Sequence, residues 1–149
     1  MRLHLLDHVD NHCPNVSASG WKLVCREECM DGALGPLRVL EALAQLGSWL
    51  ILVSSDFKRR PVLATIGRIV VHGEARPGDR IRLETRVQDL SIESAVLSGC
   101  ARVDDRLVLE VEDLLCAMVD ATLLEPVEST RRTWAWLSRQ NFPSGRFSV

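Results

Sequence analysis

Four polar side chains recur at helical spacing within an otherwise apolar stretch of the sequence. Arg38, Glu41, Gln45 and Ser48 are separated by intervals of three, four and three, so a helix would carry them on one narrow face. If that face meets solvent, it is the ordinary polar side of an amphipathic helix. If it faces a largely apolar pocket, burial raises the pKa of a carboxyl group, which then exchanges protons near neutral pH. The pattern alone leaves both interpretations open.

Histidine and cysteine spacings give little support for a metal site. Three histidines recur at intervals of four residues: His4, His8 and His12. Asn11 and Pro14 disfavour a helix there, so these side chains are not expected to share one helical face. Cys25 and Cys29 have no second pair of ligands at the spacing that zinc sites use. The sequence therefore predicts no metal and no cofactor.

Composition limits the class of protein and its partners. The 149 residues fit one domain, and a net charge of -2 gives no general attraction for nucleic acid. The cysteine count of five is odd, and no apolar stretch long enough for a signal peptide follows Met1, so we expect reduced thiols and a cytoplasmic protein. The most apolar stretch, residues 37–53, contains four polar residues and falls short of a clean membrane span. The expected partner is a small molecule or another protein.

The elements that must position the polar stripe are one long helix and a sheet. Gly35 and Pro36 stand just before a helix predicted over Leu37–Val53, because proline favours the first helical position. Turn residues and β-branched segments then predict four strands, Pro61–Gly73, Arg80–Leu90, Ser94–Val103 and Arg106–Val119. Polar and apolar residues alternate in residues 80–87, which predicts a sheet with one wet face and one buried face.

The segments outside this block give weaker predictions. Residues 3–9 are expected to form a short first element, residues 10–20 a loop rich in Asn, Pro, Ser and Gly, and residues 21–25 a strand. A mostly apolar helix is most simply buried against the dry face of the sheet. We therefore expect one α+β domain over residues 1–125. Residues 126–149 are expected to be an appendage with a short helix.

The segment Leu40–Gln45, Leu-Glu-Ala-Leu-Ala-Gln, closely resembles the Glu-Ala-Met-Ala-Gln signature on the central helix of the FabZ/FabA-type 3-hydroxyacyl-acyl-carrier-protein dehydratases. Four further segments resemble that family in the same order: Leu5–Val9, Glu27–Gly32, Pro77–Asp79 and Leu114–Asp120. The resemblance covers residues 3–120 and leaves the appendage unexplained. It implies a single hotdog domain, in which an antiparallel sheet wraps a long central helix.

The loop before the helix departs from the family pattern. In that family a Gly-His-Phe-Pro-Gly loop supplies an acid/base histidine, while the helix carboxylate of the opposite subunit handles the leaving hydroxyl. Here the loop is shorter, reads Gly-Ala-Leu-Gly-Pro, and has Ala33 at the histidine position. The resemblance implies a catalytic Glu41. The residues it implies for substrate binding are Gly32, Leu34, Gly35 and Gln45.

Alanine cannot transfer a proton, and losing a positioned general base typically costs about a hundredfold to ten-thousandfold in rate. Three replacements are conceivable: another histidine, with His72 as the candidate; the carboxylate of Asp31; or a group from a partner subunit. We therefore expect a dehydratase that is impaired alone or depends on an active partner, in fatty-acid or polyketide-type metabolism.

Two other functions remain open at this point. An acyl-thioester hydrolase would use Asp31 or Glu41 to activate water, and a non-enzymatic subunit would only bind an acyl chain or serve a structural role. The resemblance implies acyl carrier protein or coenzyme A thioesters as ligands, and a homodimer or a heteromer with a catalytically complete subunit. The basic run Lys58, Arg59 and Arg60 is expected to meet an acidic carrier protein.

Overall fold

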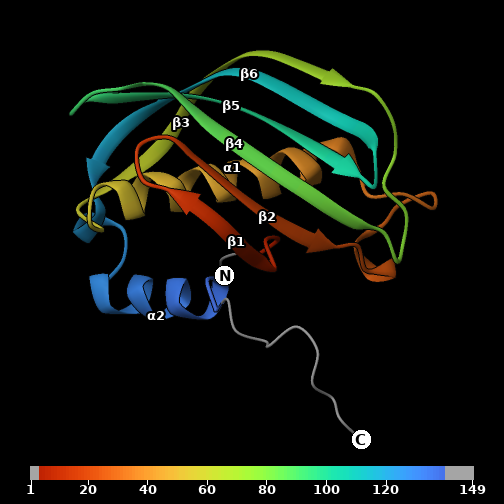
Figure 1. The fold of residues 1–149 in the computed structure, drawn as a ribbon, viewed down its shortest axis with the longest axis horizontal. Coiled ribbons are helices and arrows are strands. Elements are labelled where there is room, and N and C mark those ends of the chain that lie inside the picture. The colour runs from red at the N-terminus through yellow and green to blue at the C-terminus, as the bar shows by residue number, and fades with distance from the viewer. Residues whose placement is uncertain (1–3, 140–149) are drawn as a thin grey trace, which may run out of the picture.

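The computed structural model describes residues 4–139 and consists of one antiparallel sheet wrapped around a long helix (Figure 1). The elements in chain order are β1 (His8–Cys13), β2 (Ser17–Leu23), α1 (Pro36–Ser54), β3 (Arg59–Val71), β4 (Arg80–Leu90), β5 (Ser94–Val103), β6 (Arg106–Asp120) and α2 (Val127–Leu137). The strand order is β1-β2-β4-β5-β6-β3, so β1 and β3 are the outer strands. This arrangement confirms the predicted α+β class with a wrapped central helix.

The predicted central helix and the four strands that follow it are confirmed. β4 and β5 have the predicted bounds, and α1, β3 and β6 differ from theirs by one or two residues. Gly78 adopts a φ of +90° and Asp79 N–H donates to the carbonyl of Arg76, so Pro77 and Gly78 form the tight turn that opens β4. Strand alternation in β4 buries Ile81 and Leu83, whereas the flanking residues Arg80 and Glu84 are exposed on the outer face.

The prediction of a loop over residues 10–20 is wrong, because most of this segment forms the β1–β2 hairpin. Only residues 14–16 form the turn, where Asn15 has a φ of 64°. Gly20 marks a close approach of the two strands, since a Cβ there would collide with the carbonyl oxygen of His8. The predicted strand over residues 21–25 accordingly begins earlier, at Ser17, and ends at Leu23.

One face of α1 packs under the sheet and forms the core. Its buried residues are Val39, Leu40, Ala42, Leu43, Leu46, Gly47, Trp49, Leu50, Ile51 and Leu52. Gly99 of β5 lets the helix approach closely, because a Cβ there would lie 3.0 Å from a methyl group of Leu43. By length and composition α1 would also suit a membrane span, but half of its 18-residue apolar window is buried inside the domain.

The helix α2 packs beside the domain through aromatic side chains. The Trp134 ring lies 5.8 Å from Trp49 of α1 and 5.1 Å from His12 of β1, measured between ring centroids. The Arg131 guanidinium lies over the Phe57 ring at 4.6 Å. The part of the predicted appendage over residues 140–149 lies outside the described residues.

Candidate functional site

Three of the four polar residues on one face of α1 line an open cavity of about 310 Å³, the Glu41 cavity. Glu41, Gln45 and Ser48 contribute from the stripe, and the remaining lining residues are His4, Trp49, Leu52, Arg60, Pro61 and Val62. Glu41 is exposed to solvent in the single chain, whereas Gln45 and Ser48 are half-buried. These polar residues therefore face an open cavity with polar and apolar walls. Neither of the two interpretations left open by the sequence describes it fully.

Gln45 connects this cavity to the start of the chain. Its side-chain Oε1 accepts hydrogen bonds from the backbone N–H of Leu5 at 2.9 Å and of Leu6 at 3.3 Å. Its Nε2 donates to Oε1 of Glu41 at 3.3 Å. Because Leu5 and Leu6 are themselves buried in the core, Gln45 fixes the segment before β1 against the middle of α1.

The loop before α1 is a tight turn. Met30 and Ala33 exchange two backbone hydrogen bonds, of 3.0 and 3.2 Å, and the residues between them, Asp31 and Gly32, have φ angles of 55° and 81°. Positive φ at both central residues is the signature of a type I′ turn, for which Asp-Gly is a favoured pair. Asp31 consequently lies exposed at the tip, and Ala33 returns toward the domain.

Two contacts anchor this turn on the domain. The Leu34 N–H donates to the carbonyl of Ala75 at 2.8 Å, and the Leu34 side chain is buried. On the other side, Lys22 of β2 forms an ion pair with Glu28 at 2.7 Å. Burial raises the pKa of Glu28, but the hydrogen bonds from Lys22 and from the Cys25 N–H outweigh it and hold the pKa below its usual range.

The structure divides the predicted site residues between two cavities. A second cavity, the loop cavity, has a volume of about 280 Å³ and is lined by Ala33, Leu34 and Gly35 of the loop, by Val71 at the end of β3 and by Gly73 just after it, among others. Neither Glu41 nor Gln45 lines it. Within one chain, the predicted carboxylate and the predicted loop residues therefore do not meet. Asp31 and Gly32 line neither of these two cavities.

The predicted basic surface is only partly present. Lys58 is exposed and Arg59 half-buried, but Arg60 is buried and hydrogen bonds to Glu125 and Thr130, both at 3.4 Å. Arg60 was expected to face a carrier protein, but in the single chain its side chain turns inward to α2 and lines the Glu41 cavity. Carrier contact stays a prediction for Lys58 and Arg59.

His72 lies on the opposite side of the sheet from α1. Its Nε2 hydrogen bonds to Oε2 of Glu110 at 2.8 Å. The neighbours of Glu110 in β6, Leu109 and Val111, are buried, so the Glu110 side chain points away from the core. Its partner His72 therefore lies on the outer face of the sheet. Among residues 4–139, no three His, Cys, Asp or Glu side chains gather as a metal site would require.

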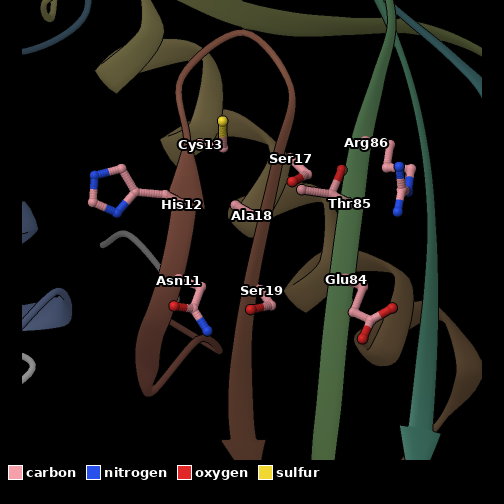
Figure 2. A pocket seen from close by; sticks show the side chains of 9 residues that line it. All are labelled: Asn11, His12, Cys13, Ser17, Ala18, Ser19, Glu84, Thr85 and Arg86. Atoms are coloured by element: carbon pink, nitrogen blue, oxygen red, sulfur yellow. The ribbon is translucent and has the colours of Figure 1, made fainter.

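Another hollow, of about 410 Å³, lies over the strands β1, β2 and β4. Figure 2 shows its side chains on these three neighbouring strands, among them Asn11, Ser19 and Glu84. None of the predicted site residues lines it. It belongs to the wet face that the alternation in β4 predicts, and polar side chains of adjacent strands account for its lining.

Sequence reasoning gave no site role to the apolar lining residues Trp49, Leu52, Pro61 and Val62, nor to the titratable residue His4. His4 lines the Glu41 cavity because Gln45 hydrogen bonds to the backbone of the next two residues, Leu5 and Leu6. These residues lie forty and thirty-nine positions before Gln45 in the chain. No local pattern reports such a contact. The retained Gln45 of the helix signature was the available signal, since a half-buried amide requires polar partners.

The chain is similar to known dehydratases over part of its length, although it matches no family model. A 3-hydroxyacyl-acyl-carrier-protein dehydratase FabZ from Clostridium tetani is 32% identical over 87 residues, which are 58% of this chain and 58% of that protein. The corresponding dehydratase FabZ from Clostridium beijerinckii is 36% identical over 89 residues, 59% of this chain and 60% of that protein. The matched segment spans less than two thirds of either relative.

Solved structures share the fold at much lower identity. A hypothetical thioesterase with coenzyme A from Streptococcus pneumoniae TIGR4 has a TM-score of 0.63 and 11% identity, covering 76% of this chain and 85% of that chain. At this identity the likeness shows the fold alone. Together with the sheet wrapped around α1, it shows that the chain has the hotdog fold, and over about three fifths of its length the chain is similar in sequence to FabZ dehydratases.

Proposed function

We propose that this protein binds 3-hydroxyacyl or enoyl thioesters of acyl carrier protein or coenzyme A, with Glu41 as the functional carboxylate. The observation that carries the proposal is the Glu41 cavity, in which the residues of the helix signature and apolar side chains share one hollow. Trp49, Leu52 and Val62 offer an apolar wall for an acyl chain, while Glu41, Gln45 and Ser48 offer polar partners for a hydroxyl group.

The proposal includes a dimer formed through β3. In the sheet of the described residues β3 has β6 on one side and no strand on the other, although it is long and rich in β-branched residues. It also exposes apolar side chains: Val62, Leu63, Ile69 and Val71. An exposed, apolar edge strand of this kind is suited to pair with a second strand.

Pairing of two β3 strands would complete the site. Pro61 and Val62, near the start of β3, line the Glu41 cavity, whereas Val71, at its end, and Gly73 line the loop cavity. Antiparallel strands related by a two-fold axis place the start of one beside the end of the other. The Glu41 cavity of one copy would thus adjoin the loop cavity of its partner, so that the helix residues and Gly35 face one substrate.

The loop limits the proposed chemistry. Ala33 offers no acid/base group, and Asp31 is held at the tip of the turn outside both cavities. We therefore propose that the loop contributes backbone contacts and a wall, and that any dehydration depends on Glu41 together with a group from elsewhere. Partner subunits, a cytoplasmic location and carrier contact through Lys58 and Arg59 remain parts of this proposal.

The test is an assay of the purified full chain with 3-hydroxybutyryl-CoA and 3-hydroxydecanoyl-CoA, in which calorimetry follows binding and mass spectrometry identifies the product. We expect the native chain to bind both thioesters. The Glu41→Gln variant should bind them more weakly, or should bind them without forming product. Glu128→Gln is the matched control, because Glu128 is exposed on α2 and lines neither site cavity. Release of free CoA would show that the protein hydrolyses the thioester instead of dehydrating it. Absence of binding to either thioester would overturn the proposal.

A further inference from the structure

We propose that His4 is the second acid/base group of the Glu41 site, in place of the histidine that the loop lacks. This inference rests on the proposed thioester function and names the group that would make the site a dehydratase. It starts from one juxtaposition: His4 and Glu41 line the same cavity in a single chain, together with Gln45 and Ser48.

The position of His4 is fixed by the neighbouring backbone. Gln45 Oε1 accepts hydrogen bonds from the N–H groups of the next two residues, Leu5 and Leu6. Consecutive Cα atoms are about 3.8 Å apart, so His4 lies one short step from this fixed point. Glu41 lies four residues before Gln45, about 6 Å along the helix axis, on the same face of α1. One amide side chain therefore positions both groups.

The other histidines of the chain have different environments. The His8 ring lies 5.8 Å from Trp21, and the His12 ring lies 5.1 Å from Trp134. His72 is bonded to Glu110 on the outer face of the sheet. Among the four histidines of the sequence, His4 is the one that lines the cavity with Glu41.

The surroundings of His4 suit proton transfer. The side chain is exposed in the single chain, so a substrate can reach it without displacing core residues. The charged groups that line the same cavity are Glu41 and Arg60, and Arg60 is bonded to Glu125 and Thr130. A carboxylate and an imidazole beside one substrate are the pair that general acid-base catalysis of a dehydration requires.

The proposed step is balanced between these two groups. Neutral His4 accepts the proton from C2 of the 3-hydroxyacyl thioester, and the electron pair of that C–H bond forms the double bond between C2 and C3. The C3–O bond breaks, and the hydroxyl leaves as water with the proton of the Glu41 carboxyl group. Transfer of the proton from His4 to the Glu41 carboxylate restores both groups. No oxidant or reductant takes part.

The experiment compares enoyl-thioester formation by the native full chain with that of His4→Ala and His4→Asn. We expect both variants to lose about a hundredfold to ten-thousandfold in rate. Added imidazole should restore part of the activity of His4→Ala, because the free base can enter the open cavity. The matched control is His72→Gln, which removes a histidine on the opposite face and should keep the native rate.

Subunit mixing tests the same-chain arrangement. If His4 and Glu41 of one chain serve one site, every site in a mixed dimer of His4→Ala and Glu41→Gln lacks one group, and mixing restores no activity. If the two groups came from different chains, one site of each mixed dimer would be intact. Restored activity would therefore overturn the pairing proposed here.

Two further results would overturn the inference. The first is a His4→Ala variant with native turnover while Glu41→Gln is inactive, which would leave the proposed function intact. The second is a native protein that binds the thioesters but forms no enoyl product, which would leave only the binding function. Failure of the native protein to bind any thioester would instead remove the proposed function on which the inference rests.

Discussion

The Lys22 ammonium lies 2.7 Å from the Glu28 carboxylate, although the Lys22 side chain is only 3% exposed. β2 thus holds a buried charge whose partner lies in the short helical turn that leads to the Asp31-Gly32 loop. A buried ammonium without a partner is costly, so this pair fixes the approach to the loop as well as contributing to stability.

Glu28→Gln should lower the free energy of unfolding by about 3 kcal/mol at neutral pH, because it leaves Lys22 buried without its counter-charge. The folded-state pKa of Glu28 is below its usual value of 4.5, so its contribution is present above that pH and is lost as the pH falls through the lower folded-state value. Urea unfolding at several pH values measures both effects. The neighbouring exposed Glu27→Gln is the control, and equal unfolding midpoints for the two variants would contradict the prediction.

The edge of β3 should control assembly. Leu63→Lys with Ile69→Lys places two charges on its exposed apolar side chains and should convert a dimer into a monomer, because charged residues prevent edge-to-edge pairing. Size-exclusion chromatography with light scattering measures the molar mass of the native protein and of the variant. Ile92→Lys adds a charge at an exposed position in the β4–β5 turn and should leave the dimer intact. A monomeric native protein would contradict the proposed interface.

Trp134 should stabilise the domain while Trp136 should not. The Trp134 ring lies tilted against the ring of Trp49, which lines the Glu41 cavity, whereas Trp136 is 58% exposed. Trp134→Ala is expected to cost about 1 to 3 kcal/mol, from lost apolar burial and the aromatic pair, and Trp136→Ala less than about 0.5 kcal/mol. Thermal unfolding of the two variants compares them, and similar melting temperatures would mean that α2 contributes little to folding.

Gly99 and Gly47 should respond differently to alanine. A Cβ at Gly99 would lie 2.7 Å from the backbone carbonyl of Glu84, which cannot move away, so Gly99→Ala should cost about 1 to 3 kcal/mol. A Cβ at Gly47 would lie 2.9 Å from a methyl group at the end of the Leu97 side chain, which can rotate. Alanine also favours a helix over glycine by about 1 kcal/mol, so Gly47→Ala should cost little. Chemical unfolding of both variants tests this order.

The fold was predictable where sequence pattern and burial coincide. β4 alternates between outward polar residues and inward residues over positions 80–87 and follows the Gly78 turn, so its bounds follow from the sequence. The β1–β2 hairpin gives no such signal. Its paired strand residues include Asn11, Ser17 and Ser19, which are residue types typical of loops. Here the contact with β4 decides the structure, and composition does not report it.

The candidate site was predictable only in part, for the same physical reason. The spacing of Glu41, Gln45 and Ser48 places them on one helix face, and the structure puts all three in one cavity. The place of His4 depends on a hydrogen bond between distant residues, which local spacing does not encode. The role of the loop residues stays a prediction, because in one chain they line a different cavity from Glu41.

The two half-cavities at opposite ends of β3 have a consequence for how the protein would respond to its own abundance. If a complete site requires two chains, the number of sites follows mass action rather than the amount of protein alone. Below the dissociation constant of the pair, activity per chain would fall with dilution, and a bound thioester that touches both chains would hold them together. Substrate supply and expression level would then act on the same equilibrium.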